Sequence, residues 1–488
     1  MEFKKFLLFL LVFSAFLPAL AKADYQDQRA DFYVEKNFDA SSSIKVSASL
    51  KKVSAKAYFY VADNWWAGLS SADREKKLAG LNDLASEFDS KIYPLLTAQF
   101  GSEWKPGIDN DSKVTVLLHS MKNDYNGYFR SGDEYERFNF PTSNQREMVY
   151  LNADYLADPF VKALLAHEFT HLIEFNQKDR IYGVSEAVWL DEARAEFAIS
   201  LLGYSKDYDQ SYLRMRAMDF LEYPFDSLTE WQGQSYDYGV LNLFTHYLVE
   251  QYGVEVLSGS LHSSRIGADS INQYLKSHFS GIDLNQAFSD WSVAVLKNDC
   301  SLGDRYCYKN QGLKNIKLVP FNNFLPFSGE STINLGQTLT EWSCHWQKFT
   351  GGRDGLKIEF KPASQPAFFK VRYVIEDNTG KLSLSSLILD KNGQGQLVIP
   401  DFSKNNKSIT IIPCLEMNPP SSADEKSYTY YLNASTLSKA DNTTTSSQAS
   451  STQIALPFST DKPMSQMSNN ELLIVLIRLI LYLKGITI

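Results

Sequence analysis

The first half of the chain alternates between strand-like and helix-like patterns of apolar residues. Lys56–Asp63, Lys113–Leu118 and Met148–Ala153 are short apolar runs rich in β-branched and aromatic residues, which predicts strands. Between the first two runs, apolar residues recur at three- and four-residue spacing and predict an amphipathic helix that Gly101 ends. That helix carries Leu78, Leu81, Leu84, Phe88, Ile92 and Leu95. We therefore expect a small α/β subdomain over residues 24–158.

From residue 159 the pattern becomes mostly helical. Asp158-Pro159 is a typical helix start, an N-cap residue followed by proline in the first turn, and it opens a helix that runs through LLAHEFTHLIEF. Further helical periodicity covers Ala187–Leu202, Tyr238–Tyr252 and Ile271–His278. The sequence predicts a helical subdomain over residues 159–325.

After Cys307 the sequence changes again, to short alternating or β-branched runs. These runs are LKIEF, FFKVRYVIED, GQLVIP and KSITIIP, and Asn392-Gly393 among them is a strong hairpin signal. They predict a β-sandwich over residues 326–432. The fold class is therefore α+β, with the β-sandwich following the mixed and helical parts.

Both ends of the chain differ from its globular part. A basic start, an apolar run and Ala21-Lys22-Ala23 have the form of a secretory signal peptide over residues 1–23, with an uncleaved anchor as the alternative. Residues 433–470 are rich in Ser, Thr, Asn and Gln and predict a flexible linker. Residues 471–488 form an apolar tail too short to span a bilayer, which predicts an interfacial or docking helix in contact with a cell surface or membrane interface.

Charge and cysteine content narrow the class of protein. The 488 residues carry a formal net charge of −9 and no Lys/Arg-rich block, which argues against a nucleic-acid partner. An even number of cysteines in an exported chain predicts disulfides, with Cys300 and Cys307 closing a short loop and Cys344 and Cys414 bracketing a later region. No CxxC or Cys/His cluster is present, so these cysteines are not expected to bind metal. The protein is expected to be secreted or held at the cell surface.

His167-Glu168-Phe169-Thr170-His171 is an HExxH motif. In a helix, the four-residue spacing places both imidazoles on one face, where they can bind one tetrahedral Zn²⁺ ion. Glu168 falls beside them, within reach of a water molecule at the metal. The alternative is a pair of surface histidines that share a face by chance. Two observations favour the zinc site. The apolar residues around the motif predict a buried helix, and acidic residues follow downstream.

A catalytic zinc ion keeps three protein ligands, so a third ligand is needed beside the two histidines. WLDEARAEFA, residues 189–198, offers Asp191 and Glu192, of which only one can face the metal. Glu192 and Glu196 share a helical face, so Glu192 can bind zinc while Glu196 accepts a hydrogen bond from a ligand histidine. Asp191 would point about 100° away. The alternative is a solvated acidic helix face.

HEFTH followed by WLDEARAEFA resembles the gluzincins, zinc peptidases that combine HExxH with a downstream glutamate. The second segment is similar to the WLNEGFA box of the alanyl-aminopeptidase family, and the overall layout resembles the hyicolysin-like secreted metallopeptidases. The resemblance covers about Met148–Gly253. It implies a zincin-like catalytic domain in which His167, His171 and Glu192 bind zinc and Glu168 is the general base.

The chain departs from related families in two ways. No GxMEN-type exopeptidase signature precedes the motif, which puts aminopeptidase activity in doubt. Glu174 and Gln177 stand where the HExxHxxGxxH extension has glycine and histidine, so metzincins are excluded.

The resemblance also offers candidates for substrate contacts. Tyr236-Asp237-Tyr238-Gly239 resembles the box that carries a tyrosine donor to the oxyanion in the aminopeptidase relatives, which selects Tyr236; Tyr238 and His246 are the other candidates. MVYLNA resembles the zincin edge strand that pairs with extended substrates, which implies substrate contacts at Asn152 and Ala153. The alternatives are a packed structural tyrosine and a strand without a binding role.

Three functions follow from these features. The leading hypothesis is a secreted zinc endopeptidase that acts on proteins or peptides. The second is an aminopeptidase, which the missing exopeptidase signature disfavours. The third is an inert zincin-fold protein that binds surfaces, which the complete HExxH motif disfavours.

Overall fold

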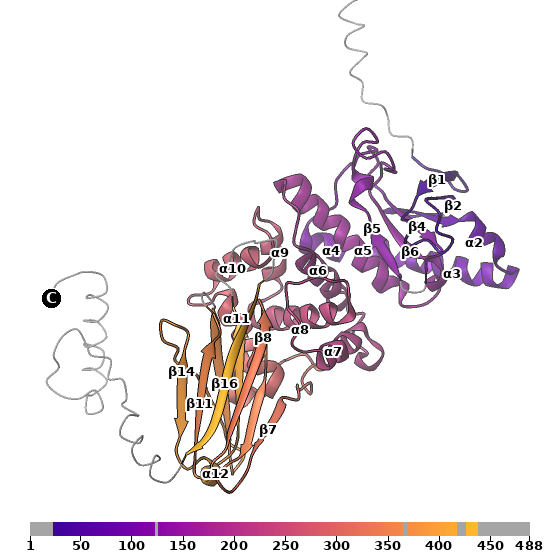
Figure 1. Ribbon diagram of the computed structural model, residues 1–488. Coiled ribbons are helices and arrows are strands. Elements are labelled where there is room, and N and C mark those ends of the chain that lie inside the picture. Colours follow the sequence, from indigo (N-terminus) through magenta and orange to yellow (C-terminus); the bar gives the residue numbers. More distant parts are fainter. Residues whose placement is uncertain (1–22, 123–124, 365–367, 417–425, 438–488) are drawn as a thin grey trace, which may run out of the picture.

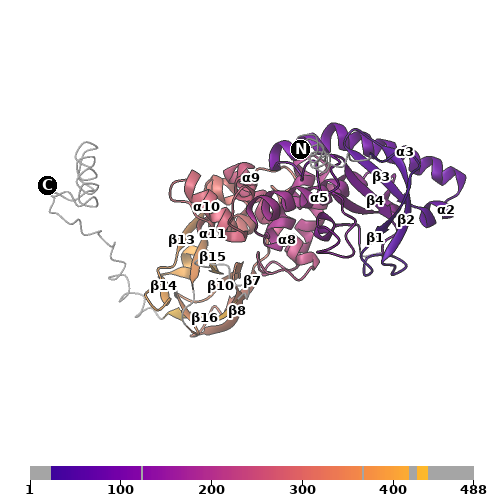
Figure 2. The ribbon, with the colours of Figure 1, turned by 90° about the horizontal axis from the view of Figure 1, so that it is seen from above.

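The computed structural model describes residues 23–122, 125–364, 368–416 and 426–437. It is a mixed helix-and-sheet structure, so the coarse α+β class is confirmed. Figures 1 and 2 show its parts in a row: the N-terminal sheet at one end, a group of helices in the middle and the C-terminal strands at the other end. The predicted apolar leader, most of the predicted linker and the apolar tail lie outside the described residues. No helix in the described ranges is long and apolar enough to cross a membrane.

Six strands form the N-terminal sheet. In spatial order they run β1-β2-β3-β4-β6-β5; β3, β4 and β6 are parallel to one another, and the other neighbours are antiparallel. Their bounds are β1 Arg29–Tyr33, β2 Lys45–Val53, β3 Ala57–Ala62, β4 Val114–His119, β5 Gly127–Phe129 and β6 Met148–Asn152. The three strands predicted from the sequence are β3, β4 and β6, which form the buried centre of the sheet.

Helices α2 (Asp63–Gly68), α3 (Ser71–Glu87) and α4 (Tyr93–Phe100) follow β3. The single helix predicted over this stretch is divided into α3 and α4 by a π-type turn at Phe88–Ile92, and Gly101 ends it as expected, with φ of 90°. The apolar residues Leu81, Leu84, Phe88 and Ile92 are fully buried against the sheet. Leu78 and Leu95 are partly exposed instead.

Strand β6 is not the edge of this sheet, and this corrects the prediction for Asn152 and Ala153. β6 pairs with β4 on one side and with β5 on the other, so its backbone groups are already used. The Asn152 amide N–H donates to the Asn126 carbonyl (2.8 Å) and its side chain caps Asp154, while Ala153 is buried in a short 3₁₀ turn. The edge strand is β5, which the sequence pattern did not reveal.

Seven helices follow the sheet. Helix α5 (Val161–Phe175) contacts β5 and β6 on one side and α6 on the other. The others are α6 Val188–Leu201, α7 Tyr212–Glu222, α8 Ser235–Tyr252, α9 Glu255–Leu261, α10 Gly267–His278 and α11 Leu284–Lys297. Buried residues of one sheet face and of these helices belong to a single hydrophobic core, so the sheet and the helices form one packed unit around α5.

The C-terminal strands form two sheets whose buried side chains share a second core. One sheet has the order β13-β12-β15-β10-β7, with β9 paired to β15; the other is β14-β11-β16-β8. Bounds are β7 Phe321–Leu325, β8 Thr332–Thr340, β9 Ser343–Cys344, β10 Gln347–Gly351, β11 Gly355–Pro362, β12 Phe369–Asp377, β13 Leu382–Ser386, β14 Gly395–Ile399, α12 Phe402–Asn405, β15 Asn406–Leu415 and β16 Ser427–Leu437. The strands therefore extend slightly beyond the expected range of 326–432 at both ends.

Asn392-Gly393 forms a turn that is closed by hydrogen bonds between Asp390 and Gln394. The strands on either side, β13 and β14, lie in different sheets, so the predicted hairpin is wrong although the turn is present. Both expected disulfides are present. Cys300 is bonded to Cys307, and Cys344 is bonded to its cross-strand partner Cys414.

Direct hydrogen bonds join the helices to the C-terminal sheets. The Trp346 indole N–H donates to the Ser292 carbonyl of α11 (2.8 Å), and the Leu228 amide donates to the Trp342 carbonyl (3.0 Å). Trp342 and Trp346 are buried in the core of the helical part rather than in that of the sheets. The two parts therefore meet across an apolar interface.

Candidate active site

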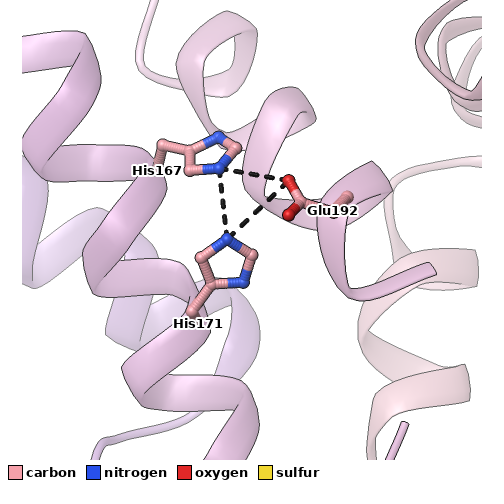
Figure 3. A group of neighbouring side chains, drawn as sticks. All are labelled: His167, His171 and Glu192. Carbon is pink, nitrogen blue, oxygen red and sulfur yellow. Dashed lines mark hydrogen bonds and ion pairs between the residues drawn. The ribbon is translucent and has the colours of Figure 1, made fainter. Parts of the chain in front are cut away.

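Helix α5 carries the HExxH motif at its centre. His167 and His171 lie one turn apart, and their Nε2 atoms approach to 3.1 Å. Most of the helix is buried because it packs between the sheet and α6, which fixes the direction of both rings. Figure 3 shows the two imidazoles pointing from α5 toward the neighbouring helix, where Glu192 completes the group.

Helix α6 places Glu192, rather than Asp191, opposite the two Nε2 atoms. Glu192 Oε2 lies 3.3 Å from His167 Nε2 and 3.9 Å from His171 Nε2. Asp191 approaches His171 from the other side of the ring, with its Oδ1 atom 2.9 Å from Nδ1. A histidine that binds a metal through Nε2 carries its proton on Nδ1, so Asp191 is placed to hold that tautomer and the ring orientation.

Glu196 does not accept the hydrogen bond that the sequence predicted. Its Oε1 atom is 3.9 Å from His167 Nδ1, which is too far for a hydrogen bond. Its two oxygens instead accept bonds from the Arg216 guanidinium (2.8 and 3.2 Å) and from the Asn242 amide (3.1 Å). The hydrogen-bonded partner of a candidate ligand histidine is therefore Asp191, and Glu196 supports the site through Arg216.

The donor atoms of His167, His171 and Glu192 fit a metal ion. They lie within 4.8 Å of one another, and this is the one group of three or more converging His, Cys, Asp or Glu side chains within the described ranges. Glu192 Oε2 is buried without a hydrogen-bond partner. Two imidazole nitrogens and one carboxylate oxygen are donors that can bind one metal ion together.

The charges of the site shift the pKa values of its groups. Burial raises the pKa of Glu168 to about 7, and the two histidines oppose that shift only in part. Burial lowers the pKa of His171, but the adjacent Asp191 carboxylate outweighs it and raises that pKa well above its usual value. Glu168 can thus change its protonation state near neutral pH, as a proton-transferring group must.

The edge strand β5 passes directly over Glu168. A Cβ atom on Gly127 would lie 2.7 Å from Glu168 Oε1 and 2.9 Å from the Tyr150 carbonyl oxygen, so only glycine fits at this position. The exposed side of β5 is therefore the strand edge nearest the candidate site. In the sequence, the only sign of this contact is the glycine at position 127.

The structure does not bring Tyr236 to this cluster. Its ring packs on Tyr223 (5.0 Å between centroids) and lines a cavity on the side of the C-terminal strands. Tyr238, two residues later on α8, faces the cluster: burial and the carboxylates of Glu192 and Glu196 raise its pKa. The Arg216 guanidinium lies 4.1 Å from the centre of its ring. Tyr238 therefore lies nearer to the cluster than Tyr236 does.

Two other side chains, His246 and Tyr212, differ in how they lie relative to the cluster. His246 is buried away from the donors, with its Nε2 atom 3.2 Å from Ser200 Oγ and its ring against Phe197. Tyr212, which the sequence analysis did not consider, also lies near the cluster. Burial raises the pKa of its hydroxyl, and the negative charges of Glu196 and Glu168 raise it further. No motif marked Tyr212, because it reaches the site from the start of α7.

The chain is similar to a curated protein. The chain is 25% identical over 319 residues to the neutral metalloprotease ShpI of Staphylococcus hyicus, covering 58% of this chain and 66% of the relative. This chain is similar to a metalloprotease. The similarity supports a metalloprotease family, and the match spans slightly less than two thirds of the relative's length. No family model matches the chain.

Solved structures resemble only a part of the chain. The periplasmic inhibitor of g-type lysozyme from Aeromonas hydrophila covers 24% of it at 13% identity, and 98% of that structure is matched. The pre-peptidase C-terminal domain of collagenase from Bacillus anthracis covers 24% at 10% identity, and 96% of that structure is matched. Both have a TM-score of 0.16, which is too low to support a fold assignment.

Proposed function

We propose that this chain is a secreted zinc-dependent endopeptidase in which His167, His171 and Glu192 bind the metal. The observation that carries the proposal is the convergence of these three donors within 4.8 Å, with Glu168 between the histidines on the same helix. The similarity to a neutral metalloprotease supports it. The two disulfides, which form in oxidising compartments, support secretion.

Zinc, when bound, supplies a Lewis acid that lowers the pKa of a water molecule and polarises a carbonyl group. Glu168 is the general base in this proposal: its carboxylate accepts the proton of the attacking water and delivers it to the leaving amine. The pKa of about 7 fits this shuttle, because the group must hold and release a proton at neutral pH. Asp191 keeps the Nδ1 proton of His171 in place.

Tyr238 is the proposed donor to the oxyanion that forms on the substrate carbonyl. Its position is supported by the influence of Glu192, Glu196 and Glu168 on its hydroxyl, and by the packing of Arg216 and Trp231 on its ring. A tyrosine held in this way donates without rearranging, which is the basis of oxyanion stabilisation.

An extended peptide would pair with the open edge of β5 in this mechanism. Backbone hydrogen bonds to a strand edge give affinity with little dependence on side chains. The contact between Gly127 and Glu168 supports this path, because it brings the strand edge beside the proposed base. Peptides and unfolded proteins are therefore the proposed substrates.

The proposal includes a zincin-like catalytic domain made of the N-terminal sheet and helices α5 to α11, followed by a β-sandwich. The shared core of the sheet and the helices supports the first unit, and the separate core between the two C-terminal sheets supports the second. We keep the sequence boundaries as part of the proposal, with residues 24–158 and 159–325 as the two halves of the catalytic domain.

Glu168→Gln tests the proposal. The variant should keep one zinc ion per chain, measured by elemental analysis, because Glu168 is not a ligand. It should digest casein at no more than about 1% of the wild-type rate, since general-base catalysis contributes typically 10²–10⁴-fold. Glu222→Gln, an exposed carboxyl at the end of α7, is the matched control and should behave as wild type.

Mass spectrometry of the products then separates the two peptidase classes. Internal fragments identify an endopeptidase, whereas stepwise loss of N-terminal residues identifies an aminopeptidase. Wild-type protein that contains no zinc after expression with zinc supplied, or a Glu168→Gln variant with substantial activity, would overturn the proposal.

A further inference from the structure

A second polar site lies apart from the metal cluster, where the loop between α7 and α8 meets strand β8. A cavity of about 380 Å³ opens there. From the loop it is lined by Asp226, Glu230 and Gln232 among others, and from β8 by Gln337, Thr338 and Thr340. The walls are thus rich in carboxylate, amide and hydroxyl oxygens, which are the ligands of hard cations.

Two buried carboxyl groups meet beside this cavity: Asp226 lines it, and Asp237 lies behind Asp226. Asp226 is 7% exposed and lines the cavity. Asp237 is 1% exposed, and its side chain lies within hydrogen-bonding reach of Asp226. Asp226 Oδ2 and Asp237 Oδ1 are both buried and without a hydrogen-bond partner. Two adjacent bare carboxylate oxygens repel each other unless a proton or a cation lies between them.

The other oxygen of Asp237 is firmly held. Asp237 Oδ2 accepts the backbone N–H groups of Gln232 and Gln234, both at 2.9 Å, and closes the capping box at the start of α8. The loop therefore cannot relax by turning this carboxylate toward solvent without losing the helix cap. Its other oxygen remains buried, and the Asp237 side chain stays within hydrogen-bonding reach of Asp226.

Within the described part of the chain, no residue that lines the cavity carries a positive charge that would neutralise the pair. Among the described residues that line the cavity, His345 is the one basic side chain; burial lowers its pKa to about 4, so it is uncharged at neutral pH. Burial, and then the charges of Asp237 and Glu230, raise the pKa of Asp226 to about 8. At neutral pH none of the described residues that line the cavity thus offers a positive charge to the two carboxyl groups.

We propose that Asp226 and Asp237 bind a calcium ion in this cavity, with Glu230 and water completing its oxygen shell. Calcium takes six to eight oxygen ligands in flexible geometry, and a polar, water-accessible cavity can supply them. Magnesium demands a tighter octahedron and sheds its water reluctantly, so it fits this open site less well. The site does not depend on the proposed peptidase activity.

A cation here would join three parts of the molecule. The loop is already bonded to the C-terminal sheets, because Ser227 Oγ donates to the Glu341 carbonyl and the Leu228 amide donates to the Trp342 carbonyl. Asp237 belongs to the first turn of α8, next to Tyr238. Calcium would therefore stabilise both the junction with β8 and the start of the helix that carries Tyr238.

The test uses the whole zinc-loaded protein in calcium-free buffer, titrated with calcium chloride while thermal unfolding is followed. A cation that binds only the folded state at 100 times its Kd should raise the Tm by about 3 °C. Zinc content is measured at each end of the titration, so that metal exchange at the histidine site is recognised. Magnesium at the same concentration should have a much smaller effect.

Asp226→Asn should abolish most of the calcium-dependent rise in Tm, since it removes one charge and one oxygen ligand. Its Tm without calcium should be at or above that of wild type, because the repulsion with Asp237 is gone. The matched control is Asp209→Asn, an exposed carboxylate on the turn before α7, which should keep the full response.

Terbium luminescence gives a reading that does not require a variant. Tyr223 and Tyr236 line the cavity, so a terbium ion bound there should be sensitised by tyrosine excitation and displaced by calcium. A wild-type Tm that does not respond to millimolar calcium, with no sensitised terbium signal, would overturn the proposal and leave a shared proton as the link between the carboxyls. A calcium response that Asp226→Asn retains in full would overturn it equally.

Discussion

The hydrogen bond between Asp191 and His171 leads to a quantitative prediction about metal affinity. Asp191 Oδ1 lies 2.9 Å from His171 Nδ1, the ring nitrogen that faces away from Glu192. A hydrogen bond to a charged group contributes about 1.5–3 kcal/mol, and loss of such a partner to a metal-binding histidine typically costs 10–100-fold in affinity. Asp191→Ala should therefore weaken zinc binding by about 10–100-fold.

Two further variants bracket this expectation. Asp191→Asn keeps an oxygen acceptor but loses the charge, so its zinc affinity should fall by only about tenfold, in line with the difference between charged and neutral hydrogen bonds. Glu192→Ala removes a proposed ligand and should lose more affinity than either Asp191 variant. Asp209→Ala serves as the control because the Asp209 carboxylate is exposed and is not part of the candidate site.

The assay is a competition titration against a chromophoric zinc chelator at constant pH, with circular dichroism to show that each variant is folded. The relative zinc affinities of Asp191→Ala and Glu192→Ala test the proposed ligand set. If Asp191→Ala loses more zinc affinity than Glu192→Ala, the proposed ligand set is wrong. If Asp191→Ala binds zinc as tightly as wild type, the hydrogen bond does not orient His171.

Three other predictions concern catalysis and stability. Tyr238→Phe should lower kcat by about 10²-fold with little change in KM, while Tyr236→Phe should behave as wild type in the same steady-state assay; equal effects would remove Tyr238 from the mechanism. Gly127→Ala should retain zinc but lower kcat by 10-fold or more, because its Cβ displaces Glu168 or β5, and unchanged kinetics would contradict that contact. Burial raises the pKa of Glu134 well above its usual value, so stability should fall as the pH rises above the range where an unfolded glutamate ionises. Glu134→Gln should therefore raise the Tm by a few °C at pH 8 and leave it nearly unchanged at pH 5, and thermal melts that show the same shift at both would argue against a buried ionisable group.

The sequence predicted which side chains converge in the candidate site where this depends on local spacing. His167 and His171 share a face because four residues make about one helical turn, and the choice of Glu192 over Asp191 follows from the same rule on α6. The buried centre of the N-terminal sheet was equally clear, since β3, β4 and β6 are continuous apolar runs. The disulfide between Cys300 and Cys307 also joins residues close in sequence.

Features that depend on tertiary contacts were not predictable in the same way. Strand β5 has three residues and no pattern of its own; it is defined by its pairing with β6. Glu196 was expected to accept a hydrogen bond from a ligand histidine, but its carboxylate binds Arg216 from α7 instead. Tyr236 matches a family box, but the capping box fixes α8 so that this ring turns toward Tyr223.

The apolar contact of Trp342 and Trp346 with the helices has a consequence for how the chain can be divided. Both indoles are nearly inaccessible to solvent and belong to the core of the helical part, although they lie beside strand β9. Cutting the chain after α11 would remove these rings and expose the apolar surface of the helices that they cover. The C-terminal region should therefore unfold together with the helices in a single transition, and a shortened chain made by deleting it should aggregate rather than fold alone.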